Sequence, residues 1–510
     1  MTILIRNARV LTMDDDDTEH DSADILVRGS KIEAIGPNLP EPAGEADLRV
    51  IDARGMLAMP GLINSHFHSG ANLLRGLDLD APLSVYMLMG HAAPVEEAGE
   101  ELPGSETHRL RSLWGATEML KWGITAVHDD AHYAGFPTDD AVAGTMQGYA
   151  DSGMRATVAT AHPNVVEYEK NPFLAETLPE DVRRKMERAA AQVSADDLVA
   201  LNRRVIERWH GACDGRIHAA LSVSSPERVT PEFFRALSAL SREHGLAFDV
   251  HVNETRYQRV LALRKHGKTF FRYMHDLGVL DERVMIIHAI WADGDDIEIM
   301  ANAGCSVAHN PITNMWTGTG IMPFRRLREA GVPIALGIDE IDGDGTNNLW
   351  GVAKAAGLLH RMAEDDWLRW PKPHEMLWCL TRGGARAMCR QHEVGMLAPG
   401  YEADLILIDL NTMPFTPLNN LRRQLVFSHL GTSVVLTMVA GTILMENGTV
   451  LTVDEEALAA EVREAAAPLL EVLSQTQKAA EPLLPYWRDM HMRVAKEDVG
   501  IMRTAGPMFP

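Results

Sequence analysis

The stretch from residue 246 to residue 339 contains four short apolar runs, LAFDVHV (246–252), VMIIHAI (284–290), CSVAHN (305–310) and VPIALGID (332–339). Segments of helical composition separate them. Four similar runs come earlier in the chain, namely MLAMPGLIN (56–64), GITAVHD (123–129), MRATVAT (154–160) and RIHAALSV (216–223). Alternation of apolar strands with helices is typical of a parallel sheet. The eight runs therefore predict an α/β protein built on a closed (β/α)8 barrel.

The two ends of the chain differ from this middle region. ILIRNARVLTM (3–13) near the start and ADLILIDL (403–410) near the end alternate apolar and polar residues, as half-buried strands do. We expect both ends to build one small β-sandwich beside the barrel. The expected division is given by four ranges: 1–57 and 394–452 for the sandwich, 58–393 for the barrel, and 453–510 for a helical appendage and tail.

The composition narrows the class of function. The 510 residues include 71 acidic and 48 basic side chains, which gives a formal net charge of -23. Nucleic acids and anionic membrane surfaces attract clustered Lys and Arg, so neither is expected as a partner. No apolar stretch is long enough for a membrane-spanning helix. The four cysteines form no CxxC pair, which is typical of a reduced, cytoplasmic protein.

Histidine and acidic residues gather where the apolar runs end. His66 and His68 are two positions apart, so both point to the same face of a strand. His251, His288 and Asp339 each close a run, at what would be the catalytic rim of a barrel. Taken alone, the His-x-His pair also fits two unrelated rim histidines. Together, these residues favour a site for one divalent metal, zinc or else iron, with a position open for water.

Several segments resemble the amidohydrolase superfamily, in particular its branch of S-adenosylhomocysteine/methylthioadenosine deaminases and s-triazine hydrolases. They follow one another in family order over about residues 1 to 450: PGLINSHFH (60–68), LLRGLDLD (73–80), HVNET (251–255), HGKT (266–269), LGVLDERVMIIHAIW (277–291), VAHNPITN (307–314), LGID (336–339) and GMLAPGYEADLILID (395–409). The resemblance implies a metal-dependent hydrolase and a homodimer or larger homo-oligomer.

Site roles follow from the resemblance by position. It implies four metal ligands, which are His66, His68, His251 and Asp339. Three residues are implied as catalytic: Glu254 as the proton shuttle, His288 beside the attacking water, and Asp339. Six more are candidates for substrate binding: Arg75, Tyr86, His309, Asn310, Asn314 and Glu340. Arg75 could instead form a salt bridge in a loop. His309, Asn310 and Asn314, which follow the seventh strand, could instead cap loops and form turns. His128 and His132 fit a pocket or a structural role equally.

The predicted reaction is hydrolytic deamination of an amino-substituted nitrogen heterocycle by metal-bound hydroxide, with release of ammonia or a small amine. Removal of chloride from a triazine or opening of a cyclic amide at the same site is the first alternative. A structural or binding protein that lacks catalysis is the second. The expected fourth strand and its loop (216–229) contain no lysine to carry a bridging carbamate, which favours a single metal. Compared with the family, the stretch 91–105 resembles an acidic insertion. The acidic stretch 340–348 fits either a solvated Gly/Asp loop or recognition of a cationic substrate.

Overall fold

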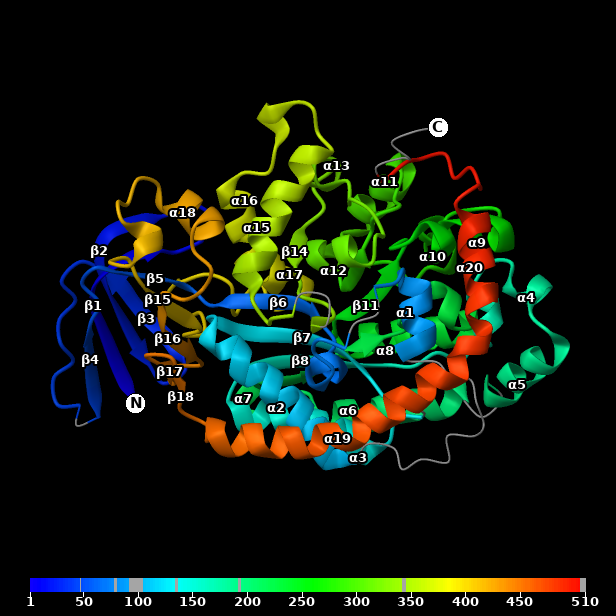
Figure 1. The fold of residues 1–510 in the computed structure, drawn as a ribbon. Coiled ribbons are helices and arrows are strands. Elements are labelled where there is room, and N and C mark those ends of the chain that lie inside the picture. Colours follow the sequence, from blue (N-terminus) through cyan, green and yellow to red (C-terminus); the bar gives the residue numbers. More distant parts are fainter. Residues whose placement is uncertain are drawn as a thin grey trace.

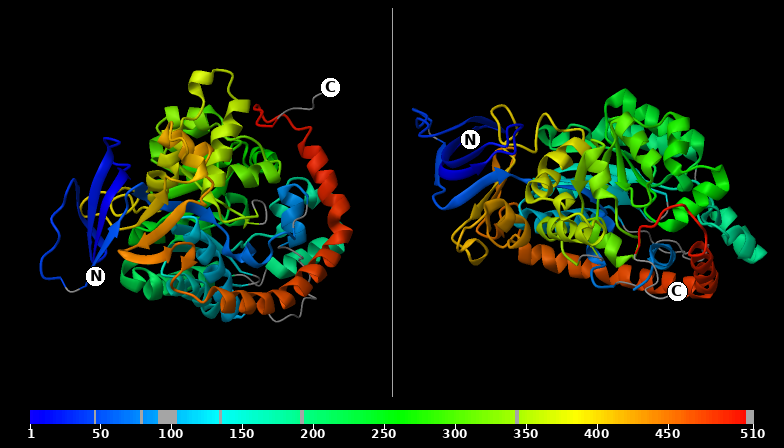
Figure 2. Two further views of the ribbon diagram at one scale, coloured as in Figure 1. Left: turned by 60° about the vertical axis from the view of Figure 1, so that its left-hand side comes forward. Right: turned by 90° about the horizontal axis from the view of Figure 1, so that it is seen from above.

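The computed structural model describes residues 1–45, 47–77, 80–90, 104–133, 136–190, 194–341 and 345–504. Most of the acidic insertion 91–105, Asp342 and Asp344 of the acidic loop, and the last six residues of the tail lie outside these ranges. A sheet made from both chain ends lies at one side of a larger body of strands and helices, and a long C-terminal helix runs along that body (Figures 1 and 2). None of the described helices has the length and apolar character needed to span a bilayer.

The strands from the chain ends form one nine-stranded sheet, as their alternating pattern predicts. Its hydrogen-bonded path runs β18-β17-β16-β15-β5-β1-β2-β3, and β4 pairs with β1. The strands are β1 (Thr2–Leu11), β2 (Glu19–Arg28), β3 (Lys31–Gly36), β4 (Leu48–Asp52), β5 (Met56–Pro60), β15 (Leu405–Asp409), β16 (Val434–Val439), β17 (Thr442–Glu446) and β18 (Thr449–Val450). Apolar side chains from both ends share one buried cluster, so this sheet has a core of its own.

The larger body contains two parallel sheets, ordered β6-β7-β8-β9 and β10-β11-β12-β13-β14. Their strands are β6 (Leu62–Phe67), β7 (Ile124–His132), β8 (Arg155–Ala161), β9 (Ile217–Ala219), β10 (Leu221–Ser222), β11 (Phe248–Val252), β12 (Val284–His288), β13 (Ser306–His309) and β14 (Ile334–Leu336). These strands coincide with the eight predicted apolar runs, and β9 and β10 share one of them. Most are wholly buried, as parallel strands covered by helices are.

Backbone contacts join the two parallel sheets at both of their edges. On one side, the amide of Ala220, between β9 and β10, donates to the carbonyl of Val158 in β8 at 2.8 Å. On the other side, Phe67 of β6 forms a parallel bridge with Asp339 after β14. The first and the last strand of the body are therefore neighbours, although more than 270 residues of chain separate Phe67 from Asp339 (339 − 67 = 272).

Helices alternate with the parallel strands and cover them (Figure 1). They are α1 (Leu83–Gly90), α2 (Ser105–Lys121), α3 (Asp139–Ser152), α4 (Leu174–Thr177), α5 (Glu180–Ala190), α6 (Ala195–Trp209), α7 (Ala212–Gly215), α8 (Pro231–His244), α9 (Arg256–His266), α10 (Phe270–Leu277), α11 (Gly294–Ala303), α12 (Pro311–Trp316), α13 (Phe324–Glu329), α15 (Leu349–Leu359), α16 (Pro373–Trp378), α17 (Gly384–Ala387), α18 (Leu421–Phe427), α19 (Glu455–Ala480) and α20 (Leu484–Val494). Short helical turns lie at Ser69–Leu73, Glu167–Glu169, Pro226–Arg228, His360–Met362, Trp367–Arg369, Cys379–Gly383, Met413–Phe415 and Glu481–Leu483.

Local sequence explains where the helix that follows β11 begins and ends. Thr255 and Gln258 form a capping box, in which each side chain accepts a hydrogen bond from the other residue's backbone amide. Gly267 ends α9 in a left-handed conformation at φ 66°. These signals fix the start of α9 two residues after Glu254, which holds that residue at the end of its strand.

A buried ion pair attaches the sheet of the chain ends to the larger body. Arg155 at the start of β8 is 2% exposed and contacts Asp404 before β15, with Nε–Oδ2 at 2.9 Å and Nη2–Oδ1 at 3.2 Å. This two-point geometry is the strong form of an arginine–carboxylate pair. Asp404 Oδ1 also accepts a hydrogen bond from the amide of Ala440 at 2.7 Å, so the negative charge of Asp404 is well compensated.

The C-terminal helices pack tightly on the body. Leu458 of α19 is buried against Leu110 and Leu113 of α2, and Trp487 of α20 is 1% exposed. Beyond α20, the chain is held by arginines of the body: Arg256 donates to the carbonyl of Glu497 at 2.5 Å, and Arg259 donates to that of Val499 at 3.0 Å. The range predicted as an appendage thus contributes to the core of the described protein.

We expect the Trp487→Ala variant to lose about 3–5 kcal/mol of stability, because a wholly buried indole is replaced by a cavity. Trp367→Ala is the matched control, since that side chain is 64% exposed and its loss costs about 0.5 kcal/mol at most. Thermal melting followed by circular dichroism measures both. Equal melting temperatures for the two variants would contradict the packing of α20 described above.

Candidate active site

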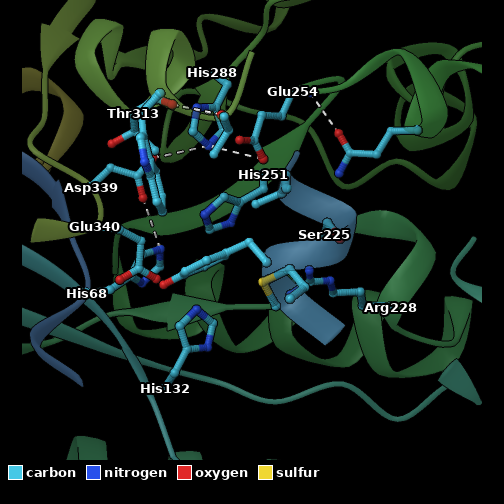
Figure 3. Close-up of a pocket in the computed structure, with 16 residues that line it drawn as sticks. His68, His132, Ser225, Arg228, His251, Glu254, His288, Thr313, Asp339 and Glu340 are labelled. Carbon is cyan, nitrogen blue, oxygen red and sulfur yellow. Dashed lines mark hydrogen bonds and ion pairs between the residues drawn. The ribbon is translucent and has the colours of Figure 1, made fainter. Parts of the chain in front are cut away.

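Five side chains that close parallel strands meet at one end of the body. His66 lies in β6 and His68 directly after it, His251 lies in β11, His288 ends β12, and Asp339 follows β14. Because the strands are parallel, their carboxyl ends lie at the same edge. Figure 3 shows His68, His251, His288 and Asp339 pointing toward one another. The structure therefore brings together the five side chains that the sequence places where the apolar runs end.

The distances between these side chains suit the binding of one metal ion. His66 Nε2 and His68 Nε2 each lie 3.4 Å from Asp339 Oδ1. The imidazole ring centres of His66 and His68 are 4.6 Å apart, and those of His66 and His251 are 4.8 Å apart. Three imidazoles and one carboxylate at such spacing form the ligand set that zinc and similar divalent metals prefer.

Hydrogen bonds turn the ring nitrogens in the direction that metal binding requires. His68 Nδ1 donates to the carbonyl of Asp130 at 2.7 Å, and His251 Nδ1 donates to that of Ser224 at 2.9 Å. With the proton on Nδ1, the lone pair of Nε2 is available to a metal. In many metal sites, a hydrogen bond on the far side of the ring orients the ligand histidine in this way. Both ring nitrogens of His66 are buried and have no hydrogen-bond partner among the described residues. A buried polar atom without a partner calls for an explanation, and a bound metal supplies one.

Burial also sets the charge of these imidazoles. It lowers the pKa of His66 and that of His251 well below the ordinary histidine value, and the neighbouring imidazoles lower both further. The rings are therefore neutral at physiological pH, which is the form that binds a metal.

Glu254 and His288 form the second half of the site. Burial, and then the charge of Asp339, raise the pKa of Glu254 well above its usual range, which favours the protonated form of this carboxyl. Its Oε2 lies 3.5 Å from His288 Nε2, which is also 3.7 Å from Asp339 Oδ2. Burial lowers the pKa of His288 to about 4. A protonated carboxyl beside a neutral imidazole is suited to moving a proton.

Two asparagines hold the ring of His288 from behind. Asn314 Nδ2 lies 3.0 Å from His288 Nδ1, and Asn310 Nδ2 lies 3.4 Å from the same atom. Donation from an amide to Nδ1 places the ring proton on Nε2, the nitrogen that faces Glu254 and Asp339. Both asparagines come from the segment after β13 that the sequence analysis singled out.

A cavity opens beside this cluster (Figure 3). Two of the six predicted substrate-binding residues line it: Tyr86, whose ring packs edge-on against Trp316 with 5.3 Å between ring centres, and Glu340. The other lining residues are His68, Leu83, Met87, His132, Ser225, Arg228, His251, Glu254, Gln258, His288, Thr313, Trp316, Thr317 and Asp339. The cavity therefore has an apolar wall on one side and the ionisable cluster on the other.

The remaining four predicted substrate-binding residues lie outside this lining. Arg75 forms an ion pair with Glu118, which is the structural alternative weighed for it. His309 is buried with its Nε2 2.9 Å from Nε2 of His360, and Asn310 and Asn314 contact His288. Direct contact of these four with a substrate stays a prediction.

Three residues of the site were missed or left open by the sequence analysis. Gln258 bonds the backbone amide of Glu254 through Oε1 at 2.7 Å, and the Thr-x-x-Gln capping signature was the available signal. Arg228 lines the cavity, although its sequence position after the fourth strand gave no sign of it. His132 also lines the cavity, whereas His128 is buried and pairs with Asp249 at 3.1 Å.

The backbone is strained where the strands end. Ser224, Asn253, His288 and Asp339 all have positive φ, from 50° to 73°. Such conformations cost on the order of 1–3 kcal/mol each in non-glycine residues and concentrate at functional sites. Gly337 is required by packing, since a Cβ there would lie 2.9 Å from the backbone nitrogen of His66 and 2.5 Å from Asn310 Oδ1.

We expect His66→Ala to abolish metal binding, because it removes the one ligand whose two ring nitrogens have no other partner in the described protein. The loss of metal affinity should exceed the roughly 10–100-fold that removal of an outer hydrogen-bond partner costs. Elemental analysis of the purified protein measures it. His309→Gln serves as the control, since this histidine lies near the site but outside the ligand set. Full metal content in His66→Ala would exclude His66 as a ligand.

Comparison with known proteins agrees with this geometry. The model of the amidohydrolase family matches residues 57–444. The 5'-deoxyadenosine deaminase of Methanosarcina acetivorans is 31% identical over 92% of this chain and 98% of its own length. The 5-methylthioadenosine/S-adenosylhomocysteine deaminase of Pelotomaculum thermopropionicum is 30% identical over 92% of this chain and 99% of its own. Among solved structures, the atrazine chlorohydrolase of Arthrobacter aurescens TC1 complexed with zinc superposes with a TM-score of 0.81, at 26% identity over 91% of this chain and all of that one.

The matched range contains every strand of the larger body, and the ligand set and Glu254 lie inside it. The resemblance first seen in short motifs therefore extends over nearly the whole chain. The chain belongs to the amidohydrolase family, and it is a metal-dependent hydrolase of carbon–nitrogen bonds other than peptide bonds, acting by hydrolytic deamination of a nitrogen heterocycle.

Proposed function

We propose that the enzyme uses one divalent metal, zinc rather than iron, held by four ligands: His66, His68, His251 and Asp339. The observation that carries this proposal is the approach of two buried imidazoles, those of His66 and His68, to one oxygen of Asp339, with the ring centre of His251 4.8 Å from that of His66. The ring nitrogens of His66 have no hydrogen-bond partner in the described chain. The zinc in the similar atrazine chlorohydrolase supports the choice of metal. When bound, the metal supplies a water molecule of lowered pKa and a centre of positive charge.

Three residues of this chain would then carry the chemistry. Glu254, which holds a proton, donates it to the ring nitrogen next to the carbon that bears the amine. His288 presents its Nε2–H to the oxygen that adds to the same carbon, because Asn314 fixes its tautomer. Asp339 accepts one proton from the attacking water and returns it to the departing amine. The second proton of that water leaves the added hydroxyl as the carbonyl forms and restores the proton of Glu254. The products are the oxo-heterocycle and ammonia.

The substrate class we propose is a 6-aminopurine nucleoside altered at its 5' position. The names of the two curated deaminase relatives support this choice, since both act on such nucleosides. The cavity supports it as well, because Tyr86 and Trp316 offer an aromatic wall for a planar base and Glu340 offers a hydrogen-bond acceptor. Contacts from Arg75, His309, Asn310 and Asn314 to the substrate remain predictions.

We also propose that the two parallel sheets close into a (β/α)8 barrel over 58–393, and that 1–57 and 394–452 form a β-sandwich. The contacts of Ala220 with Val158 and of Phe67 with Asp339 support closure. Four free cysteines support a reducing, cytoplasmic location. The homodimer or larger oligomer implied by family resemblance stays a prediction.

Glu254→Gln should retain the metal and lose deaminase activity by about 10²–10⁴-fold, since the amide cannot carry the transferred proton. Release of ammonia measures the activity, and elemental analysis measures the metal. A variant with near-normal turnover would exclude Glu254 as the proton carrier. A variant that loses its metal would instead assign Glu254 to the ligand set.

The leaving group is tested with matched substrates. We expect ammonia from 5'-deoxyadenosine and no chloride from a chlorinated s-triazine, because the two deaminase relatives have higher identity to this chain than the chlorohydrolase has. Ion chromatography for chloride and an enzymatic ammonia assay measure the two products. Chloride release without ammonia release would replace deamination by dechlorination as the function.

A further inference from the structure

The chain beyond α20 contacts two loops at the active-site end of the body. It leaves α20 and runs toward α11 (Figure 1, red). The guanidinium of Arg503 donates from Nε to the carbonyl of Ile290 at 3.0 Å and from Nη2 to that of Ala292 at 2.6 Å. The backbone carbonyl of Arg503 accepts a hydrogen bond from the amide of Ile321 at 2.8 Å. One residue of the C-terminal segment therefore joins the loop after β12 to the loop after α12.

The first of these loops determines the orientation of His288. At its start, His288 and Ala289 both have positive φ, 73° and 51°. Non-glycine residues keep such conformations only where surrounding contacts hold them. The carbonyls of Ile290 and Ala292, which Arg503 bonds, lie two and four residues beyond His288. The side chain of Arg503 is therefore placed to hold the turn that orients this imidazole.

The second loop supports the asparagine that contacts His288 from behind. Thr319 donates to the carbonyl of Asn314 from its amide at 3.0 Å and from its hydroxyl at 3.3 Å. Asn314 Nδ2 in turn lies 3.0 Å from His288 Nδ1. The indole of Trp291, in the first loop, donates to the carbonyl of Thr319 at 2.8 Å. The two loops are thus bonded to each other as well as to Arg503, and both support the same imidazole.

The segment that carries Arg503 has its own attachment to the body. Arg256 donates to the carbonyl of Glu497 at 2.5 Å, and Arg259 donates to that of Val499 at 3.0 Å. Both arginines belong to α9, and the side chain of Val499 is buried. The position of Arg503 is therefore determined partly by contacts that lie outside the two loops, and this allows it to hold them in place.

The charged surroundings of Arg503 do not explain its position. Burial, and then the positive charges of Arg326 and Arg259, lower the pKa of its guanidinium to about 10, while Asp293 acts in the opposite direction. The guanidinium stays charged at neutral pH but lies in surroundings that are unfavourable for a cation. Charge-assisted hydrogen bonds to the two loop carbonyls offset this cost. The interaction with the backbone of the loop is therefore what keeps the side chain there.

We infer that Arg503 is a positioning residue for the deamination: by bonding both loops, it holds the imidazole of His288 with Nε2 toward the oxygen that adds to the heterocycle. This inference rests on the proposed function, which gives His288 that role. Arg503 lies beyond residues 57–444, the range that the family model matches. The C-terminal segment consequently contributes to catalysis from outside the matched range.

The experiment uses the full-length variant Arg503→Met, which removes all the donors of the guanidinium. We expect kcat for ammonia release from 5'-deoxyadenosine to fall by about 10–100-fold, because a small displacement of a catalytic group has an effect of that size. KM and the metal content should stay near their wild-type values, because the proposed ligands and the residues that line the cavity are all retained. Steady-state kinetics well below the melting temperature of each protein measures the two constants.

Two further variants act as controls. Arg503→Lys keeps a charged donor and should recover part of the lost kcat. Arg493→Met removes an arginine of α20 that pairs with Asp489 at 2.9 Å, and it should leave kcat as in wild type. A wild-type kcat in Arg503→Met, or an equal fall of kcat in Arg493→Met, would overturn the inference.

A double-variant comparison tests whether Arg503 acts through His288. In the His288→Ala background the further change Arg503→Met should lower kcat by less than about 3-fold, because residues that act through one another are not additive. If the further change lowers kcat as much as it does in the wild-type background, Arg503 acts on the reaction by another route and the inference is wrong.

Failure of the proposed function would look different. If wild type releases no ammonia from 5'-deoxyadenosine, the proposed substrate class is wrong, and the support of the loops is then tested without activity. Hydrogen exchange measured by mass spectrometry should be at least about 10-fold faster in Arg503→Met than in wild type for peptides that contain the amides of Trp291 and Ile321, the usual effect of losing one or two hydrogen bonds. Arg493→Met should exchange as wild type does. Equal exchange in Arg503→Met and wild type would exclude the support of the loops by Arg503.

Discussion

The pairing of the first and the last parallel strand is the contact on which the active site depends. The amide of Asp339 donates to the carbonyl of His66 at 2.9 Å, and the amide of His68 donates to the carbonyl of Asp339 at 3.4 Å. These bonds place two ligands from the start of the body beside the carboxylate from its end. Gly337 makes the approach possible, because any side chain there would collide with the backbone of His66. A site assembled in this way exists only when the whole body is folded.

Burial gives the assembled groups their protonation states. Removing His66 and His251 from water favours their neutral forms, and removing Glu254 from water favours its protonated form. The same physical cause therefore prepares a set of neutral ligands and a proton donor a few ångströms away. Without a metal, the buried ring nitrogens of His66 have no hydrogen-bond partner in the described chain, and their burial therefore lowers the stability of the folded protein.

The loops that carry the catalytic residues are supported by remote parts of the chain. Arg259 of α9 donates to the carbonyls of Trp291 and Val499, and so connects the segment after β12 to the C-terminal end. Arg503 donates to the carbonyl of Ile290 at 3.0 Å, two residues beyond His288. No periodicity or motif in the last fifty residues indicated these contacts, because backbone carbonyls have no signature in sequence. The appendage expected there turns out to hold the segment that follows His288.

The strands of the body, their polar ends, and the residue types that suit a metal and a proton carrier can be predicted from the amino-acid sequence, because hydrophobic periodicity and ligand chemistry are local properties. The sequence also determined the family, through motifs such as PGLINSHFH (60–68) and HVNET (251–255). Which of the candidate residues line the cavity became clear from the folded structure. Asn310 and Asn314 contact His288, and their contact with a substrate stays a prediction. Arg228 lines the cavity without any sequence signal. The physical reason is that the direction of a side chain at a strand end depends on backbone strain and on partners hundreds of residues away.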